Sequence, residues 1–322
     1  FTGHYQVPLY TYIVLLVFIL FHLPKQEKGG RLRFLALTCM PLLLGLVMAT
    51  PQLLATNQLS SVSLRPKNGY TFFTGSSMNP WLFVQFVFPF IYTRSYGKGL
   101  YGPGNFTESS GFVGMLMVVF AAIALLRYFR RDRQVRLWFW VGLVALFLML
   151  GSHNPLYRIM WYVPVYRLFR VPTRNVLEFD LALVCLGALG LTHVMQDKQE
   201  NRRWLLVGII VPLAAGTFLA LLGRTVFNLM VSSKSTAFRQ GLEGALRWNN
   251  KALLIPMACA LGYLVAWALW YHGRELARLA AGALLLVMVL ELFSFTPFID
   301  KWYYNIKDVQ KEEVSSWKGF LQ

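Results

Sequence analysis

The chain has 322 residues, of which 56% are hydrophobic and only 14% are charged. A soluble domain carries about one quarter charged residues, so this composition excludes an ordinary soluble protein and is typical of a polytopic membrane protein. The net charge of +17 does not indicate nucleic-acid binding, because the basic residues cluster in short segments between apolar runs.

Eight segments are apolar enough to form transmembrane helices, which need roughly 20 residues each. In chain order they are Tyr5–Leu23, Phe34–Leu54, Gly111–Tyr128, Leu137–Gly151, Val176–Met195, Trp204–Leu222, Ala252–Tyr271 and Leu276–Phe293. We therefore predict an all-α, polytopic transmembrane helix bundle of about eight spans, with one transmembrane domain over residues 1–294.

The loops between these segments predict the orientation of the bundle. Four short connections, near residues 25–33, 127–136, 198–203 and 274–278, are dense in Lys and Arg. Such connections face the cytoplasm, so both ends of the chain are expected on the extracytoplasmic side. The chain opens without Met or a signal peptide, and we expect it to be an internal piece of a longer polypeptide whose extracytoplasmic segment begins at 295–322.

Two long outer loops contain apolar stretches that are too short to span. Met78–Tyr92 is an aromatic run bracketed by prolines, which predicts an interfacial or re-entrant segment. In Gly151–Arg174, Leu156, Ile159, Met160 and Val163 recur at helical spacing, which predicts a short helix in the headgroup layer that ends near Pro164.

Several short pieces of these loops together carry a family resemblance. They are Gly3–Gln6, Pro51–Leu54 followed by Leu59–Arg65, Pro89, Tyr101–Glu108 leading into Gly111–Gly114, Gly151–Tyr157, and Phe169–Arg174. In order and spacing, over roughly residues 1–195, the chain resembles the YfhO-type bacterial membrane proteins, which are related to the GT-C glycosyltransferases. From Trp204 onward only the alternation of spans agrees.

The resemblance implies a transferase at the outer face of the bacterial inner membrane. It would take a sugar from a polyprenyl-phosphate donor and pass it to a cell-surface acceptor. In that superfamily the catalytic carboxylate follows the first span, a region that we expect upstream of Phe1. The catalytic residues are therefore not assigned, and this chain is expected to supply a surface that binds the lipid carrier.

Four arginines on the outer loops are candidates for binding the carrier phosphate, because a guanidinium can hold phosphate through two parallel hydrogen bonds. They are Arg65, Arg94, Arg170 and Arg174. The alternative is that they contact lipid phosphates in general or pair with carboxylates that hold the loops.

Three acidic residues are candidates for a polar cavity. Glu178 and Asp180 lie one to two turns inside the fifth predicted span, where an ionisable group usually faces the bundle interior. Glu178 follows Arg174 by four residues, which predicts a neutralising pair on one helix face, whereas Asp180 has no such local partner. Glu108 is predicted to cap the N-terminus of the third span, with an acceptor hydroxyl or a divalent cation as alternatives.

Other chemistry has little sequence support. His153 in the central loop is a further candidate for the polar cavity, where it is expected to form ordinary hydrogen bonds rather than to act in catalysis. Cys39, Cys185 and Cys259 fall in apolar runs without metal-ligand spacing. No P-loop or GxSxG motif occurs, and no metal or other cofactor is predicted.

The expected partners are membrane lipids, the polyprenyl-phosphate-linked sugar and other membrane subunits, without nucleic acid. Two alternatives to a transferase remain open. One is a non-catalytic structural subunit of a membrane complex built on the same scaffold. The other is a secondary transporter, which would require internal repeats and paired broken helices.

Overall fold

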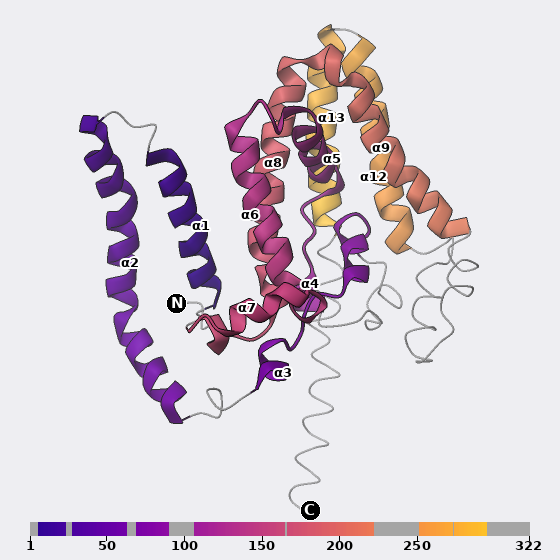
Figure 1. Cartoon of the computed structure of the whole chain (residues 1–322). Coiled ribbons are helices and arrows are strands. Elements are labelled where there is room, and N and C mark those ends of the chain that lie inside the picture. Colours follow the sequence, from indigo (N-terminus) through magenta and orange to yellow (C-terminus); the bar gives the residue numbers. More distant parts are fainter. Residues whose placement is uncertain are drawn as a thin grey trace, which may run out of the picture. The chain divides into compact units, whose positions relative to one another are not determined.

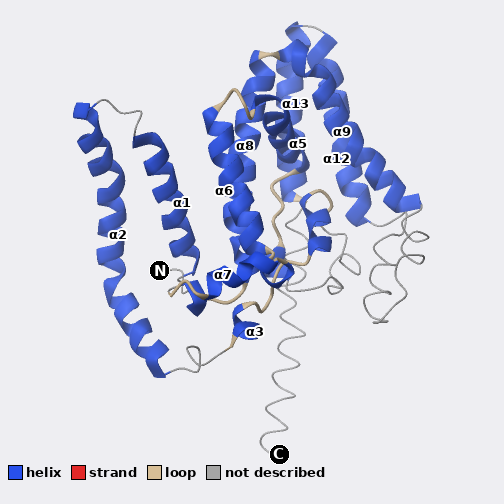
Figure 2. Cartoon of the chain, in the orientation of Figure 1, coloured by secondary structure: helices blue, strands red, loops and turns tan. Residues whose placement is uncertain are grey.

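The computed structural model describes residues 6–23, 28–62, 69–89, 106–164, 166–221, 251–272 and 274–294 (Figure 1). Within these ranges every regular element is a helix and no residue lies in a β-strand (Figure 2). The prediction of an all-α protein is therefore confirmed for the described part of the chain. Arg65 and Arg94, the loop 222–250 and the segment 295–322 lie outside it.

All eight predicted spans lie on helices. The long helices are α1 (Gln6–His22), α2 (Lys28–Val62), α6 (Arg133–Met149), α8 (Val176–Gln196), α9 (Lys198–Leu221), α12 (Lys251–His272) and α13 (Arg274–Phe293). The third predicted span is the shorter helix α5 (Met115–Ile123), which continues into one π-helical turn, η4 (Ala124–Tyr128).

Four of the described helices are long and apolar enough to cross a membrane. These segments are Gly29–Thr56, Pro172–Gln196, Gln199–Leu219 and Leu253–Tyr271. Gln6–His22, Met115–Tyr128 and Leu279–Phe293 are apolar but shorter. The described part of the chain is thus all-helical and has the long apolar helices of a membrane protein, and the total of eight spans stays a prediction. The run that begins at Met78 contains the 3-10 helix η3 (Pro80–Phe86), and its predicted re-entrant path is likewise untested.

The chain divides into two compact units. Unit 1 comprises Phe1–Pro80, Thr107–Gly111 and Tyr128–Cys185, and unit 2 comprises Trp81–Phe106, Phe112–Arg127 and Leu186–Gln322. Helix α8 therefore contributes its first half to unit 1 and its second half to unit 2. The predicted site residues in the described ranges all belong to unit 1.

The core of unit 1 is a cluster of aromatic side chains. Its buried members are Tyr10, Phe73, Tyr157 and Tyr166, which are between 1% and 6% exposed. Phe73 stacks on Tyr157 with ring centroids 5.1 Å apart, and Tyr10 stacks on Tyr166 at 5.9 Å. The rings come from α1, α3 (Tyr70–Phe73), η6 (Pro155–Tyr157) and η7 (Tyr166–Leu168), so burial of these large apolar surfaces fixes the central loop on α1.

Unit 2 is built around the short helix α5. A Cβ atom on Gly190 would lie 2.0 Å from the carbonyl oxygen of Phe120, and one on Gly187 would lie 2.9 Å from that of Met117. Only glycine permits such close approach of two helix backbones, as is common in membrane bundles. With η4, α5 rises at most about 21 Å at about 1.5 Å per residue, which is less than the roughly 30 Å of the hydrocarbon core.

The N-terminus of α5 is held by a buried carboxyl group on α13. Both oxygens of Glu291 accept the backbone N–H of Met115 at 3.2 Å, and Oε2 also accepts the hydroxyl of Tyr263 at 2.7 Å. Glu291 is only 2% exposed. It satisfies an N–H group that has no partner within α5 and lies where the helix dipole favours negative charge.

Candidate functional site

The central loop of unit 1 is a series of short helices between α6 and α8. They are η5 (Gly151–His153), η6, α7 (Arg158–Trp161), η7 and η8 (Pro172–Asn175). Helix α7 lies beside the end of α6 (Figure 1). The predicted short helix before Pro164 is therefore present, ending at Trp161, and its position in the headgroup layer remains a prediction.

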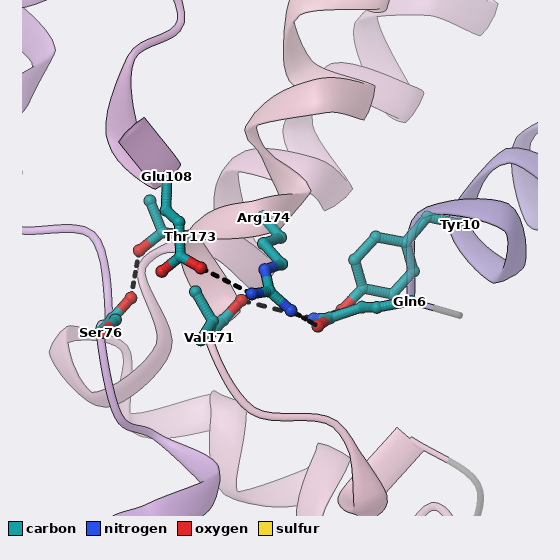
Figure 3. Close-up of polar contacts among 7 residues, drawn as sticks. All are labelled: Gln6, Tyr10, Ser76, Glu108, Val171, Thr173 and Arg174. Carbon is teal, nitrogen blue, oxygen red and sulfur yellow. Dashed lines mark hydrogen bonds and ion pairs between the residues drawn. The ribbon is translucent and has the colours of Figure 1, made fainter. Parts of the chain in front are cut away.

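The first residue of this series, Gly151, has a left-handed backbone conformation. Gly151 has φ +50°, and a Cβ atom there would lie 2.2 Å from Oγ of Ser77. That Oγ accepts the N–H of Ser152 at 2.8 Å, and Thr173 donates its hydroxyl to the carbonyl oxygen of Ser76 (Figure 3). The loop near Ser77 is thus bound to both ends of the helical series.

A buried hydrogen-bond network joins α1 to the start of α8. Nε2 of Gln6 donates to the hydroxyl of Tyr10 at 2.7 Å, and that hydroxyl donates to the hydroxyl of Tyr166 at 3.3 Å. Nδ2 of Asn175 donates to the hydroxyl of Tyr166 at 3.2 Å and to the carbonyl oxygen of Pro172 at 2.8 Å. Burial raises the pKa of Tyr166 well above its ordinary value, so its hydroxyl stays protonated and able to donate.

Arg174 connects three segments of unit 1. Its guanidinium donates to Oε1 of Glu108 at 2.6 Å and to Oε1 of Gln6 at 3.0 Å (Figure 3). The side chains of Arg174 and Glu108 are 20% and 21% exposed, so the ion pair is partly shielded from water. The predicted pair between Arg174 and Glu178 is therefore wrong. Arg174 lies in the 3-10 helix η8, before the first turn of α8, so the spacing rule for an α-helix does not apply to it.

The predicted role of Glu108 is wrong as well. Glu108 belongs to the short helix α4 (Phe106–Ser109), whereas the helix of the third predicted span begins at Met115 and is capped by Glu291. One Glu108 oxygen is instead an acceptor for Arg174. Glu108 and Arg174 thus neutralise each other, and Arg174 would have to release Glu108 to bind a phosphate through the same N–H groups.

Three other arginines of the central loop are exposed: Arg158, Arg167 and Arg170. None of them forms an ion pair with a carboxylate among the described residues. Arg170 lies over the ring of Phe72 at 5.4 Å, and Arg158 lies over Tyr70 at 5.8 Å. Stacking on an aromatic face orients a guanidinium and leaves its N–H edges free for an anion. Of the predicted phosphate ligands in the described chain, Arg170 therefore has the more available guanidinium.

An apolar cavity of about 210 Å³ lies in unit 1 between α1 and α6. Its lining includes Ile13, Val14 and Val17 of α1; Leu137, Trp140, Val141, Val144, Ala145 and Leu148 of α6; and Tyr10, Tyr166, Asn175 and Glu178. Because Tyr10, Tyr166 and Asn175 belong to the buried network, the cavity extends from that network along both helices. A dry cavity of about 150 Å³ already binds benzene, so this one has room for several carbon atoms.

Glu178 and Asp180 are the two unsatisfied carboxyl groups of this region. Oε2 of Glu178 and Oδ1 of Asp180 are buried without a hydrogen-bond partner. Such a group costs about 1–3 kcal/mol relative to a satisfied one. Glu178 lines the cavity, whereas Asp180 is not among the residues lining it.

The remaining predicted site residue, His153, is exposed at the end of η5. Its backbone N–H donates to the carbonyl oxygen of Leu150 at 3.0 Å. The described part of the chain contains no group of three or more His, Cys, Asp or Glu residues placed to hold a metal ion.

Sequence reasoning did not identify the polar partners that hold the site together. Gln6 and Tyr10 are four residues apart on α1, and Asn175 directly follows Arg174. Their only sequence signal is that each is polar at the edge of an apolar run, where a buried polar group needs a partner. Glu291 carried a stronger signal, since it is an acidic residue inside a predicted span.

The fold and the site together define a helical membrane protein with a buried polar network, an apolar cavity and exposed arginines at one end of unit 1. No protein-family model, no curated protein and no solved structure matches the chain. The function is therefore inferred from the site itself.

Proposed function

We propose that the chain is the membrane region of a glycosyltransferase-like protein of the YfhO type, related to the GT-C enzymes. The protein would take a sugar from a polyprenyl-phosphate donor at the outer face of the bacterial inner membrane. In this proposal the bundle has about eight spans, and unit 1 supplies the surface that binds the lipid carrier.

The observation that carries this proposal is the cavity between α1 and α6. Its walls are hydrocarbon side chains, and it extends from the network of Tyr10, Tyr166 and Asn175 along both helices. Several of its lining residues are also exposed on the surface of the unit, including Ile13 at 47% and Val144 at 54%. An isoprenoid segment could therefore enter sideways from the bilayer and bury its apolar surface, which contributes about 25 cal/mol per Å².

The phosphate of the carrier would bind at the exposed arginines of the central loop. Arg170 has a stacked guanidinium without a carboxylate partner among the described residues, so it does not have to break an existing ion pair. The acceptor hydroxyl would displace the phosphate at the anomeric carbon of the sugar. A general base would take the proton of that hydroxyl, and Arg170 would stabilise the charge on the departing phosphate.

The cavity can be tested by filling it. Ala145 lines it and is 3% exposed, whereas Leu143 on the same helix is 39% exposed and is not among its lining residues. We expect Ala145→Phe to reduce photocrosslinking of a diazirine-bearing polyprenyl phosphate to the membrane-embedded chain at least fivefold. Leu143→Phe is the matched control and should crosslink like the wild type.

Two outcomes would contradict the carrier role. One is equal labelling of both variants, and the other is crosslinks that map only to helices outside unit 1. Replacing Arg170 by Gln should weaken labelling by the phosphate-bearing probe and leave labelling by the corresponding polyprenol unchanged. An equal loss with both probes would argue against a phosphate contact.

The second candidate is a non-catalytic subunit built on the same scaffold. The ion pair of Arg174 with Glu108 favours it, because this arginine already has a structural partner in unit 1. A wild-type chain that folds and copurifies with other membrane proteins, but captures no polyprenyl-phosphate probe, would support this alternative over the transferase.

A further inference from the structure

We propose that the segment Leu156–Arg170 of unit 1 is a membrane-docking surface that inserts its apolar side chains into a leaflet containing anionic lipids. The proposal concerns the bulk lipid surface. It holds whether or not the cavity between α1 and α6 binds a carrier.

The first observation is that the helical stretch of this segment is apolar on two sides. On the inner side Tyr157 is buried, and Met160 and Trp161 pack against the aromatic cluster. Four large side chains on the other side are exposed: Leu156 at 57%, Ile159 at 62%, Tyr162 at 80% and Val163 at 40%. The inner contacts fix the helix on the unit, so the outer side chains are held outward.

The second observation is the charge of the same segment. Residues 151–175 contain four arginines and neither Asp nor Glu. Arg174 is neutralised by Glu108, but Arg158, Arg167 and Arg170 are exposed and form no ion pair with a described carboxylate. Three positive charges therefore flank the exposed apolar side chains.

This combination fits a lipid surface that carries negative charge. A short helix with large apolar side chains and flanking arginines lies in the boundary between headgroups and acyl chains. Exposed arginines near that boundary attract anionic headgroups. The segment is part of the central loop, which joins the end of α6 at Met149 to the start of α8 at Val176. Tyr162 and the arginines are suited to the polar layer, and Ile159 to the acyl layer below it.

The depth of the segment can be measured in the intact chain. Cys39, Cys185 and Cys259 are first replaced by Ser, and Ile159→Cys is then labelled with an environment-sensitive fluorophore. The labelled chain is reconstituted into phosphatidylcholine nanodiscs with or without about 30 mol% phosphatidylglycerol. With phosphatidylglycerol about one lipid in three is anionic, so the disc surface carries negative charge. We expect blue-shifted emission, and quenching by a lipid with a shallow spin label at least twofold stronger in the anionic discs.

Two matched controls isolate the apolar face and the charge. Ser152→Cys carries the same label at an exposed polar position of the central loop, and it should be quenched by aqueous iodide rather than by labelled lipid. Replacing Arg158, Arg167 and Arg170 by Gln should abolish the difference between the two lipid compositions at position 159. Replacing Arg130, Arg131 and Arg136 by Gln removes the same charge near the other end of α6 and should leave that difference intact.

The proposal is overturned if the label at position 159 is as accessible to iodide as the label at position 152. It is also overturned if lipid composition has no effect on the wild-type background. A label shielded from both iodide and spin-labelled lipid would identify a protein–protein contact on this face instead. Circular dichroism and size-exclusion profiles like those of the unlabelled chain show that each variant is folded.

Discussion

Each unit contains buried carboxyl groups on an apolar helix, and the two units treat them differently. In unit 2, Glu291 is 2% exposed and accepts hydrogen bonds from Met115 and Tyr263. In unit 1, Glu178 and Asp180 each have a buried oxygen without a partner. The satisfied group joins α13 to α5 and α12, whereas the unsatisfied oxygens join nothing in the described chain.

Whether a buried carboxyl group has hydrogen-bond partners separates structural residues from candidate functional residues. The mere presence of an acidic residue in a predicted span does so less clearly. A buried polar group with all its partners is explained by the fold that it stabilises. A buried oxygen without a partner costs free energy and calls for another explanation, such as a ligand contact or a change of conformation. Glu178 meets this criterion and also lines a cavity, so it is the better functional candidate of the two glutamates.

The largest loss of folding stability is expected from substitution of Glu291. Glu291→Ala leaves the hydroxyl of Tyr263 and the N–H of Met115 without an acceptor, which should destabilise the chain by about 3 kcal/mol. Glu291→Gln keeps an acceptor and should cost about 1 kcal/mol. Thermal unfolding in detergent measures both variants. A Glu291→Ala variant that unfolds at the wild-type temperature would remove the structural role assigned to this carboxyl group.

An intermediate change in folding stability is expected from breaking the ion pair of Arg174 with Glu108. A double-mutant cycle with Arg174→Gln and Glu108→Gln should give a coupling free energy of about 1–2 kcal/mol, because the pair is partly shielded from water. The matched pair in unit 2 is Arg127 with Glu200, whose side chain is 61% exposed, and its coupling should stay below about 1 kcal/mol. Equal coupling in the two cycles would mean that burial does not distinguish the pairs.

The smallest change in folding stability is expected from substitution of Glu178. Glu178→Met replaces a poorly satisfied carboxyl group by an apolar side chain of similar length beside an apolar cavity. The free energy of unfolding should change by no more than about 1 kcal/mol, and in the stabilising direction. The same unfolding assay applies. A loss as large as that of Glu291→Ala would show that Glu178 has a structural partner and would erase the contrast between the units.

The helices were largely predictable from sequence because apolar length is a local property. All eight predicted segments lie on helices, including the fourth, which is within α6. The third is the short helix α5, and nothing local reveals that Gly187 and Gly190 of α8 pack closely against it. Composition gives the apolar length of a helix, but whether lipid or protein surrounds it depends on neighbours that are distant in sequence.

The site was predictable only in its location. The arginines of the central loop and the nearby acidic residues were identified, but their partners were not, since Arg174 pairs with residues 66 and 168 positions away. The local rule that predicted its pairing with Glu178 requires a continuous α-helix, and Pro172 begins a 3-10 turn there instead. Arg174 therefore pairs with residues that are distant in sequence, and not with Glu178 four positions away.

The capping of α5 by Glu291 also constrains the order in which the protein can mature. The N-terminus of α5 and the carboxyl group that caps it are 176 residues apart in the chain. At a synthesis rate of about 5–20 residues per second, α5 leaves the ribosome roughly 9–35 s before its cap does. During that interval the backbone N–H of Met115 lacks the carboxyl group that accepts it in the folded chain. Unit 2 is therefore completed late, when α13 delivers Glu291.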